Sequence, residues 1–178
     1  MVIAAAGRRI DSADATTPRF PLHNVPALER QLDALFARER ATALVASAAC
    51  GADLVALTVA GRRGMRRRVI LPFIADAFRT TSVTDRPGDW GPVFDRVLAE
   101  LDPHGDVITL DDGESNAAYV RANDAILEEA AHLGQDSGTG AMAVLIWEGA
   151  RRGDDDVTAA FGDAARQRGW RVEHVRTV

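Results

Sequence analysis

Two adjacent arginines stand directly after the first apolar segment of this 178-residue chain. Arg8 and Arg9 follow the run Val2–Ala6 and Gly7. A guanidinium group donates paired hydrogen bonds to a phosphate or a carboxylate, so at least one of the two arginines could bind an anionic ligand. The alternative is a pair of exposed turn residues. Their position after an apolar segment, rather than their residue type, suggests the binding role.

Two carboxylates follow other apolar segments. Glu148 comes directly after Met142–Trp147, and it is the best single candidate for a general base or for a contact to a ribose hydroxyl. The alternative is that Glu148 only caps a helix. Asp53 follows the small residues Ser47–Gly51, where it could accept a hydrogen bond from a ribose hydroxyl or cap the following helix. We favour the cap for Asp53. These two side chains are the catalytic candidates if the protein is an enzyme.

Aromatic and amide side chains could complete such a site. Tyr119 and Asn123 are one helical turn apart, so they share a helix face and could hold a base or a ribose, or fix the helix to a loop. Trp90 and Trp147 could stack on a base, but large aromatic residues at such positions more commonly fill the rim of a core. Cys50 has no histidine motif nearby, and we interpret it as a small buried thiol.

Composition excludes several classes of chemistry. All 21 basic residues are arginine, so neither Schiff-base lysine chemistry nor a P-loop lysine is available. The net charge of -5 argues against binding to duplex nucleic acid. One cysteine and four scattered histidines predict no metal site, and no cofactor is expected. No apolar run is long enough to span a membrane, and no signal peptide is recognisable. We therefore expect a cytoplasmic protein.

Apolar runs alternate with helical patterns along the whole chain. Expected strands are Val2–Ala6, Ala43–Ala46, Arg68–Leu71, a weaker Asp106–Leu110, Met142–Trp147 and Val172–Val178. Expected helices are Val25–Arg40, Asp53–Ala60, Trp90–Leu101, Tyr119–Leu133 and Val157–Arg168. The arginine cluster Arg62–Arg68 is placed in one connection, at the opposite rim from the candidate site, and is expected to be solvated.

The strands are apolar on both faces, which is typical of a parallel sheet covered by helices on both sides. The prediction is an α/β fold with a doubly wound, mostly parallel, Rossmann-like sheet, forming a single domain over residues 1–178. Ligands of such sheets bind at the carboxyl ends of the strands. The residues expected to bind the ligand there are Gly7, Arg8, Arg9, Ser47, Gly51, Ala52, Asp53, Pro72, Ser82, Tyr119, Asn123, Trp147, Glu148, Gly149 and Thr158.

A series of short motifs at these segment ends resembles the SLOG superfamily, Rossmann-like domains related to the DNA-processing protein DprA and to the LOG phosphoribohydrolases. The motifs are Gly7-Arg8-Arg9-Ile10-Asp11, Arg19-Phe20-Pro21, Ser47 to Asp53, Leu71-Pro72-Phe73, Phe78 with Ser82-Val83, Trp90, Tyr119 to Asn123 and Ile146-Trp147-Glu148-Gly149. They occur in order over nearly the whole chain. The resemblance implies a nucleotide-type ligand at the strand ends and a role as a sensor of nucleotide-derived ligands.

This chain departs from that family in two places, at the phosphate-binding turn and at the catalytic motif. Where the family has a Gly-Gly-Thr turn, this chain has Gly153-Asp154-Asp155-Asp156-Val157-Thr158, whose carboxylates would repel a phosphate, although aspartates also cap helix starts. The LOG motif Pro-Gly-Gly-x-Gly-Thr-x-x-Glu, with its catalytic glutamate, does not occur in this sequence. The first departure argues against phosphate binding at that loop, and the second argues against hydrolysis.

The preferred hypothesis is binding or sensing of a nucleotide or nucleotide-derived small molecule, without metal or covalent catalysis. The first alternative is a hydrolase of nucleotide N-glycosidic or phosphoribosyl bonds, with Glu148 or Asp53 as acid or base. The second is a ligand-free interaction or dimerisation scaffold, and a homodimer is one possible form of the protein.

Overall fold

The computed structural model describes residues 1–110, 113 and 115–178. Their six strands form one parallel sheet in the order β4-β3-β2-β1-β5-β6. The strands are β1 (Val2–Gly7), β2 (Ala43–Ala46), β3 (Arg66–Leu71), β4 (Val107–Thr109), β5 (Ala141–Trp147) and β6 (Val172–Arg176). The α-helices are α1 (Val25–Arg38), α2 (Ala52–Arg62), α3 (Ala75–Phe78), α4 (Gly91–Leu101), α5 (Asn116–Asp136) and α6 (Val157–Gln167).

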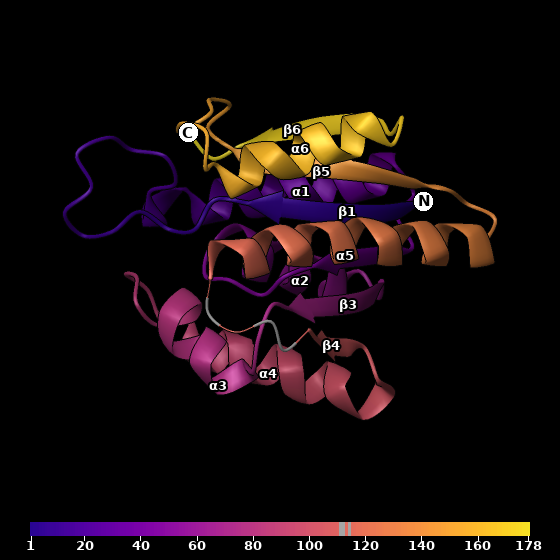
Figure 1. Ribbon diagram of the computed structural model, residues 1–178, viewed down its shortest axis with the longest axis horizontal. Coiled ribbons are helices and arrows are strands. Elements are labelled where there is room, and N and C mark those ends of the chain that lie inside the picture. The colour runs from indigo at the N-terminus through magenta and orange to yellow at the C-terminus, as the bar shows by residue number, and fades with distance from the viewer. Residues whose placement is uncertain (111–112, 114) are drawn as a thin grey trace.

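Helices cover both faces of this sheet, and each face has its own core. Helices α5 and α6 lie in front of the sheet in Figure 1, while α1 and α2 lie behind it. The core behind the sheet joins alternate strand residues, such as Ile3 and Leu44, to α1, α2 and α4. The core in front joins the intervening residues, such as Val2 and Val45, to α5 and α6. The doubly wound, Rossmann-like α/β prediction is therefore confirmed.

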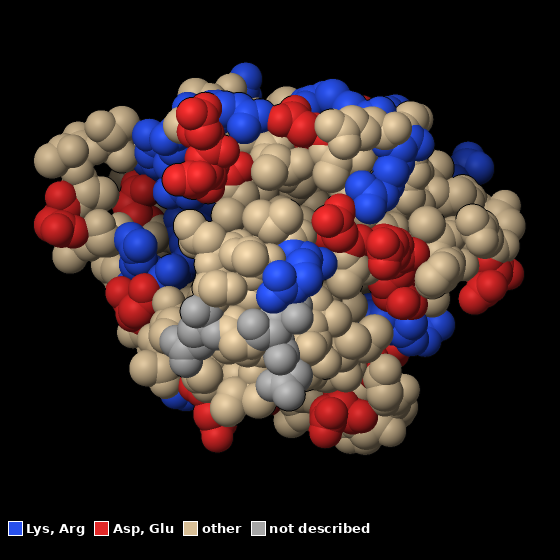
Figure 2. Space-filling view, in the orientation of Figure 1, with Lys and Arg blue, Asp and Glu red and all other residues tan. Residues whose placement is uncertain are grey.

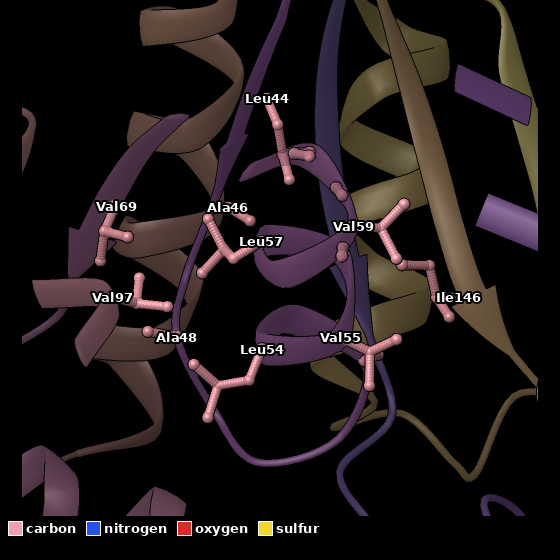
Figure 3. Close-up of a cluster of buried hydrophobic side chains, with 14 of the residues drawn as sticks. Leu44, Ala46, Ala48, Leu54, Val55, Leu57, Val59, Val69, Val97 and Ile146 are labelled. Atoms are coloured by element: carbon pink, nitrogen blue, oxygen red, sulfur yellow. The ribbon is translucent and has the colours of Figure 1, made fainter. Parts of the chain in front are cut away.

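Helix α2 shows why the strands lack a polar face. Leu54, Val55, Leu57 and Val59 of this helix are all buried. Figure 3 shows them among side chains of the neighbouring strands and of α4. Burial of an apolar side chain of this size stabilises a fold by about 1.5–3 kcal/mol, and strands between two helix layers gain this on both faces.

The order of the strands places a switch point beside β1. The chain proceeds from β1 to β2, β3 and β4 on one side, and then returns to the other side of β1 with β5 and β6. The segments after β1 and after β5 consequently leave the sheet in opposite directions. Such a divergence at the carboxyl ends of the strands is where doubly wound sheets bind ligands.

The structure differs from the expected elements at β3, after β3 and at the start of α5. Strand β3 begins at Arg66, two residues earlier than expected, and α2 ends at Arg62, so of the five arginines in the cluster Arg62–Arg68 only Arg63 lies in a connection. Each of the five arginines in that cluster also pairs with a carboxylate, such as Arg68 with Asp106. Helix α3 and the short π-helix η2 (Arg79–Val83) follow β3, where no helix was expected. Helix α5 begins at Asn116, three residues earlier than predicted.

Two 3-10 helices complete the description, η1 (Leu22–Asn24) before α1 and η3 (Asp102–His104) after α4. Over the described ranges, none of the helices has both the length and the apolar character needed to cross a membrane.

Candidate functional site

A cavity of about 640 Å³ lies at the carboxyl ends of β1 and β2, beside the switch point. Its walls come from the segment after β1, the ends of α3 and η2, the first half of α5 and the start of α6. The loop after β1 projects from this edge of the molecule at the left of Figure 1. Ser12, Ala15, Thr16 and Thr17 of that loop line the cavity. Asp11 fixes the base of the loop by accepting from the backbone amides of Arg19 and Phe20.

Nine of the residues expected to bind a ligand line this cavity, and six do not. Those that line it are Gly7, Arg8, Arg9, Ser47, Asp53, Ser82, Tyr119, Asn123 and Thr158. The other six, Gly51, Ala52, Pro72, Trp147, Glu148 and Gly149, lie outside the lining. Parallel strands end at one edge of the sheet, which explains why segments distant in sequence meet here.

Arg8 is the most buried charge in the wall. Only 2% of its side chain is exposed, and it donates to two carboxylates. Nε of Arg8 lies 2.6 Å from Glu148 Oε2, and Nη1 lies 2.6 Å from Asp156 Oδ1. Nη2 also donates to the carbonyl oxygen of Ala150 at 2.8 Å, and the guanidinium lies 5.5 Å from the Trp147 ring centroid. Arg8 therefore bridges the segments after β1 and β5.

Asp156 occupies the N-terminus of α6. Its Oδ1 accepts from the backbone amides of Thr158 and Ala159, and its Oδ2 accepts from that of Arg152. Burial alone would raise the pKa of this carboxyl, but hydrogen bonds from Arg8 and from these amides outweigh it and hold the pKa well below its usual range. Capping by this aspartate, expected for the triplet, is confirmed. The helix end that binds phosphate in many α/β folds already holds a carboxylate of the chain itself.

Glu148 is directed to the same network rather than to the cavity. It accepts from Arg8 and from Arg19, and 9% of its side chain is exposed. Burial raises the pKa of this carboxyl, but the two guanidinium groups and a backbone amide lower it more. A carboxylate held as an anion by two arginines is a weak proton acceptor. Its position favours a structural role over the predicted role of general base.

Asp53 lies inside the cavity, and its predicted role as a helix cap is wrong. The N-cap of α2 is Gly51, whose φ of 94° few other residues adopt and which has no side chain to cap the helix. Asp53 instead accepts from the backbone amide of Ala49 at 3.2 Å. Burial raises the pKa of this carboxyl to about 7, although the Ala49 amide, the Arg9 charge and the Gly7 amide oppose the rise. Asp53 can therefore carry or release a proton near neutral pH.

Four further arginines line the cavity and are more exposed than Arg8. Exposed fractions are 30% for the side chains of Arg9, Arg19 and Arg86, and 48% for Arg152. Figure 2 shows blue and red side chains interleaved at this edge of the molecule. Arg86 and Arg152 were not singled out by the sequence, because neither follows a strand directly. In the sequence, each is an arginine in a loop, and this feature does not distinguish a residue that lines a cavity from one that is simply exposed.

Uncharged polar side chains also line the cavity. Ser82 is buried and lies 2.9 Å from the Tyr119 hydroxyl. Asn123 is also buried and donates through Nδ2 to the carbonyl oxygen of Val157 at 2.9 Å. Tyr119 and Asn123 therefore fix α5 to neighbouring segments while they line the cavity. Ser47 completes this part of the lining.

Other candidates have structural roles. The Trp90 indole donates to the carbonyl oxygen of Pro87 at 2.9 Å, and that of Trp147 donates to His174 Nδ1 at 3.0 Å. Both rings are buried at the rim of the core, as expected. Cys50 is buried as well, and burial raises the pKa of its thiol. Within the described residues, no three histidine, cysteine or carboxylate side chains gather as a metal site would require.

Gly7 permits the close approach of α2 to β1, and a valine there is expected to lower the free energy of unfolding by about 1–3 kcal/mol. A Cβ at Gly7 would lie 2.3 Å from Ala52 Cβ and 2.7 Å from the carbonyl oxygen of Ile146. Denaturant unfolding of Gly7→Val measures the loss. Gly61→Ala is the control, because a Cβ there meets only the flexible end of Arg67 and should leave stability unchanged or raised. Equal stability of the two variants would contradict this account.

No protein-family model matches this sequence, and no curated protein matches it. Among solved structures, the X-ray structure of DNA processing protein A (DprA) from Streptococcus pneumoniae is similar to it, with a TM-score of 0.44 and 14% sequence identity. The match covers 96% of this chain and 57% of that chain, so this chain spans a little over half the length of that protein. The strand order and the two helix layers establish the doubly wound fold independently of this similarity.

Proposed function

We propose that this chain binds a nucleotide or nucleotide-derived small molecule in the cavity at the carboxyl ends of β1 and β2. The observation that carries the proposal is the presence of partly exposed guanidinium groups and buried uncharged polar groups in one cavity. Arg9, Arg86 and Arg152 are partly exposed in its lining, and Ser82 and Asn123 are buried there beside the charged Arg8 and Asp53. A nucleotide offers matching groups, an anionic phosphate at one end and a neutral base and sugar at the other.

The chemistry of the lining suits each part of such a ligand. Cavities of roughly 300–1,000 Å³ bind small molecules, and this one has about 640 Å³. Guanidinium groups bind phosphate through paired hydrogen bonds. The hydroxyls of Ser82 and Tyr119 can bond a sugar or a base edge, and Phe78 and Ile126 supply apolar contact to a ring. The sequence resemblance to the SLOG superfamily suggests the same ligand class and a sensing role.

A thermal-shift panel of nucleoside mono-, di- and triphosphates, cyclic nucleotides, ADP-ribose and NAD tests the proposal. A ligand at 100 times its dissociation constant adds about 2.7 kcal/mol of stability, which should raise the unfolding midpoint by about 5–11 °C. The matching nucleosides, which lack phosphate, should give smaller shifts because the arginines then have no anion to bind. A flat panel would overturn nucleotide binding and leave the scaffold hypothesis in its place.

One observation favours a second candidate function, hydrolysis of an N-glycosidic bond. Asp53 has a pKa of about 7 and lines the cavity, so it could give its proton to the departing base and then take up the proton that water releases when it adds to the sugar carbon. Incubation of the protein with the four nucleoside 5′-monophosphates, monitored for free base, tests this. Base release by the native chain and its loss in Asp53→Asn would establish hydrolysis. Binding without release would leave a sensor.

A further inference from the structure

One exposed carboxylate lies between two arginines of the cavity. Asp85 belongs to the loop that joins η2 to α4. Its Oδ1 accepts a hydrogen bond from Arg9 Nη2, and its Oδ2 lies 3.5 Å from Arg86 Nε. Arg9 and Arg86 both line the cavity, whereas Asp85 lies outside the lining. The two guanidinium groups thus share one carboxylate, each through a different oxygen atom.

Among the described residues, two other carboxylates pair with arginines of the cavity, and Asp85 differs from both. Asp156 is fully buried and accepts from three backbone amides, and Glu148 is 91% buried between Arg8 and Arg19. Asp85 is 33% exposed, and across the described residues it accepts no hydrogen bond from a backbone amide. Exposed ion pairs contribute little to stability, so among these three carboxylates Asp85 is the one that an external anion can replace.

One nitrogen of Arg9, Nε, could donate a further hydrogen bond to a ligand. Its Nε is buried, and within the part of the chain that the structure describes it has no hydrogen-bond acceptor among nitrogen and oxygen atoms. The guanidinium of Arg9 also interacts with the Cys50 thiol, which is a weak acceptor. A phosphate has more acceptor oxygens and more negative charge than a carboxylate, so it can satisfy two guanidinium groups better than Asp85 does.

From this arrangement we infer that Arg9 and Arg86 form the phosphate subsite of the cavity, and that Asp85 holds this subsite in the free protein until the phosphate of the ligand displaces it. The inference rests on the proposed function and assigns the orientation of the ligand. Its phosphate lies at the exposed mouth, and its uncharged part lies toward Ser82 and Tyr119. The alternative place for a phosphate, the N-terminus of α6, is filled by Asp156.

The test is the affinity of the Asp85→Asn variant for inorganic pyrophosphate, measured by isothermal titration calorimetry. Removing the competing carboxylate should tighten binding about tenfold relative to the native chain, because the anion no longer displaces an ion pair or faces a like charge. Arg86→Gln should weaken binding at least fivefold. Asp95→Asn is the matched control, since it removes the same charge from an exposed pair with Arg79 outside the cavity. It should change the affinity by less than twofold.

The four nucleoside 5′-monophosphates and their nucleosides are titrated into the same variants. Nucleotide affinity should follow the pyrophosphate pattern, and nucleoside affinity should not change. If Asp85→Asn binds pyrophosphate no more tightly than the native chain, the subsite is refuted, even where nucleotides bind. If the pyrophosphate pattern holds but no nucleotide binds, the subsite stands and the proposed nucleotide function fails. If neither pyrophosphate nor any nucleotide binds, the phosphate subsite and the proposed nucleotide function are both overturned.

Discussion

Replacing Arg8 with methionine is expected to lower the free energy of unfolding by about 3–5 kcal/mol. The substitution keeps the length of the side chain but leaves Glu148 and Asp156, both buried, without their shared partner. Breaking a buried ion pair from one side costs this much because an uncompensated charge remains in the interior. At roughly 2–4 °C per kcal/mol, the midpoint of thermal unfolding should fall by about 6–20 °C.

Two comparisons isolate the cause of that loss. Arg38→Met removes an exposed arginine that pairs with Glu39 and Glu173, and it should change stability by about 1 kcal/mol or less. Adding Asp156→Asn to Arg8→Met should recover part of the loss, since one of the two buried carboxylates that lost Arg8 is then neutral. A loss below about 1 kcal/mol for Arg8→Met would show that the network contributes little.

Asp53→Asn is expected to raise stability at alkaline pH by up to about 4 kcal/mol while leaving it nearly unchanged near pH 4. Burial raises the pKa of Asp53 from 3.8 to about 7 in the folded chain. Between these two values the folded state holds a proton that the unfolded state has released, so stability falls as pH rises from about 4 and levels off above pH 7. A rise of this size in pKa corresponds to about 4 kcal/mol. The amide of asparagine does not ionise.

Denaturant unfolding of both proteins from pH 4 to pH 9 measures this effect. The difference between the native chain and Asp53→Asn isolates Asp53 from the other carboxylates, whose lowered pKa values act in the opposite direction on the acid side. The carbon chemical shift of the Asp53 carboxyl gives the pKa directly. Parallel stability profiles for the two proteins would contradict a raised pKa.

Strands and helices of this chain follow from local patterns, and the sequence predicts most of them. Apolar runs such as Ala43–Ala46 have no polar face, and their shortness and their alternation with helical patterns indicate buried parallel strands. Helix α3 was missed because it has only four residues, too few for a 3.6-residue periodicity to show. The strand order could not be predicted, since no local pattern states which side of β1 receives β5.

The charged part of the site was harder to predict than the fold. The sequence places Arg8 and Glu148 at the correct edge of the sheet, but it cannot show that they neutralise one another, because ion pairing depends on side-chain geometry across 140 residues of chain. Asp53 matched the pattern of a helix cap, yet Gly51 starts the helix and leaves Asp53 facing the cavity. Arg86 and Arg152 join the lining only because the fold returns their loops to this edge.

The bridge from Arg8 to Asp156 also bears on the order in which the protein is made. Its two ends are separated by 148 positions in the chain. Contacts of such long range form late, because closing a long loop costs entropy before the contact repays it. During synthesis, β1 to β4 can assemble while this wall of the cavity is still missing. Competence to bind a ligand should therefore be acquired in the last step of folding, once α6 has emerged from the ribosome.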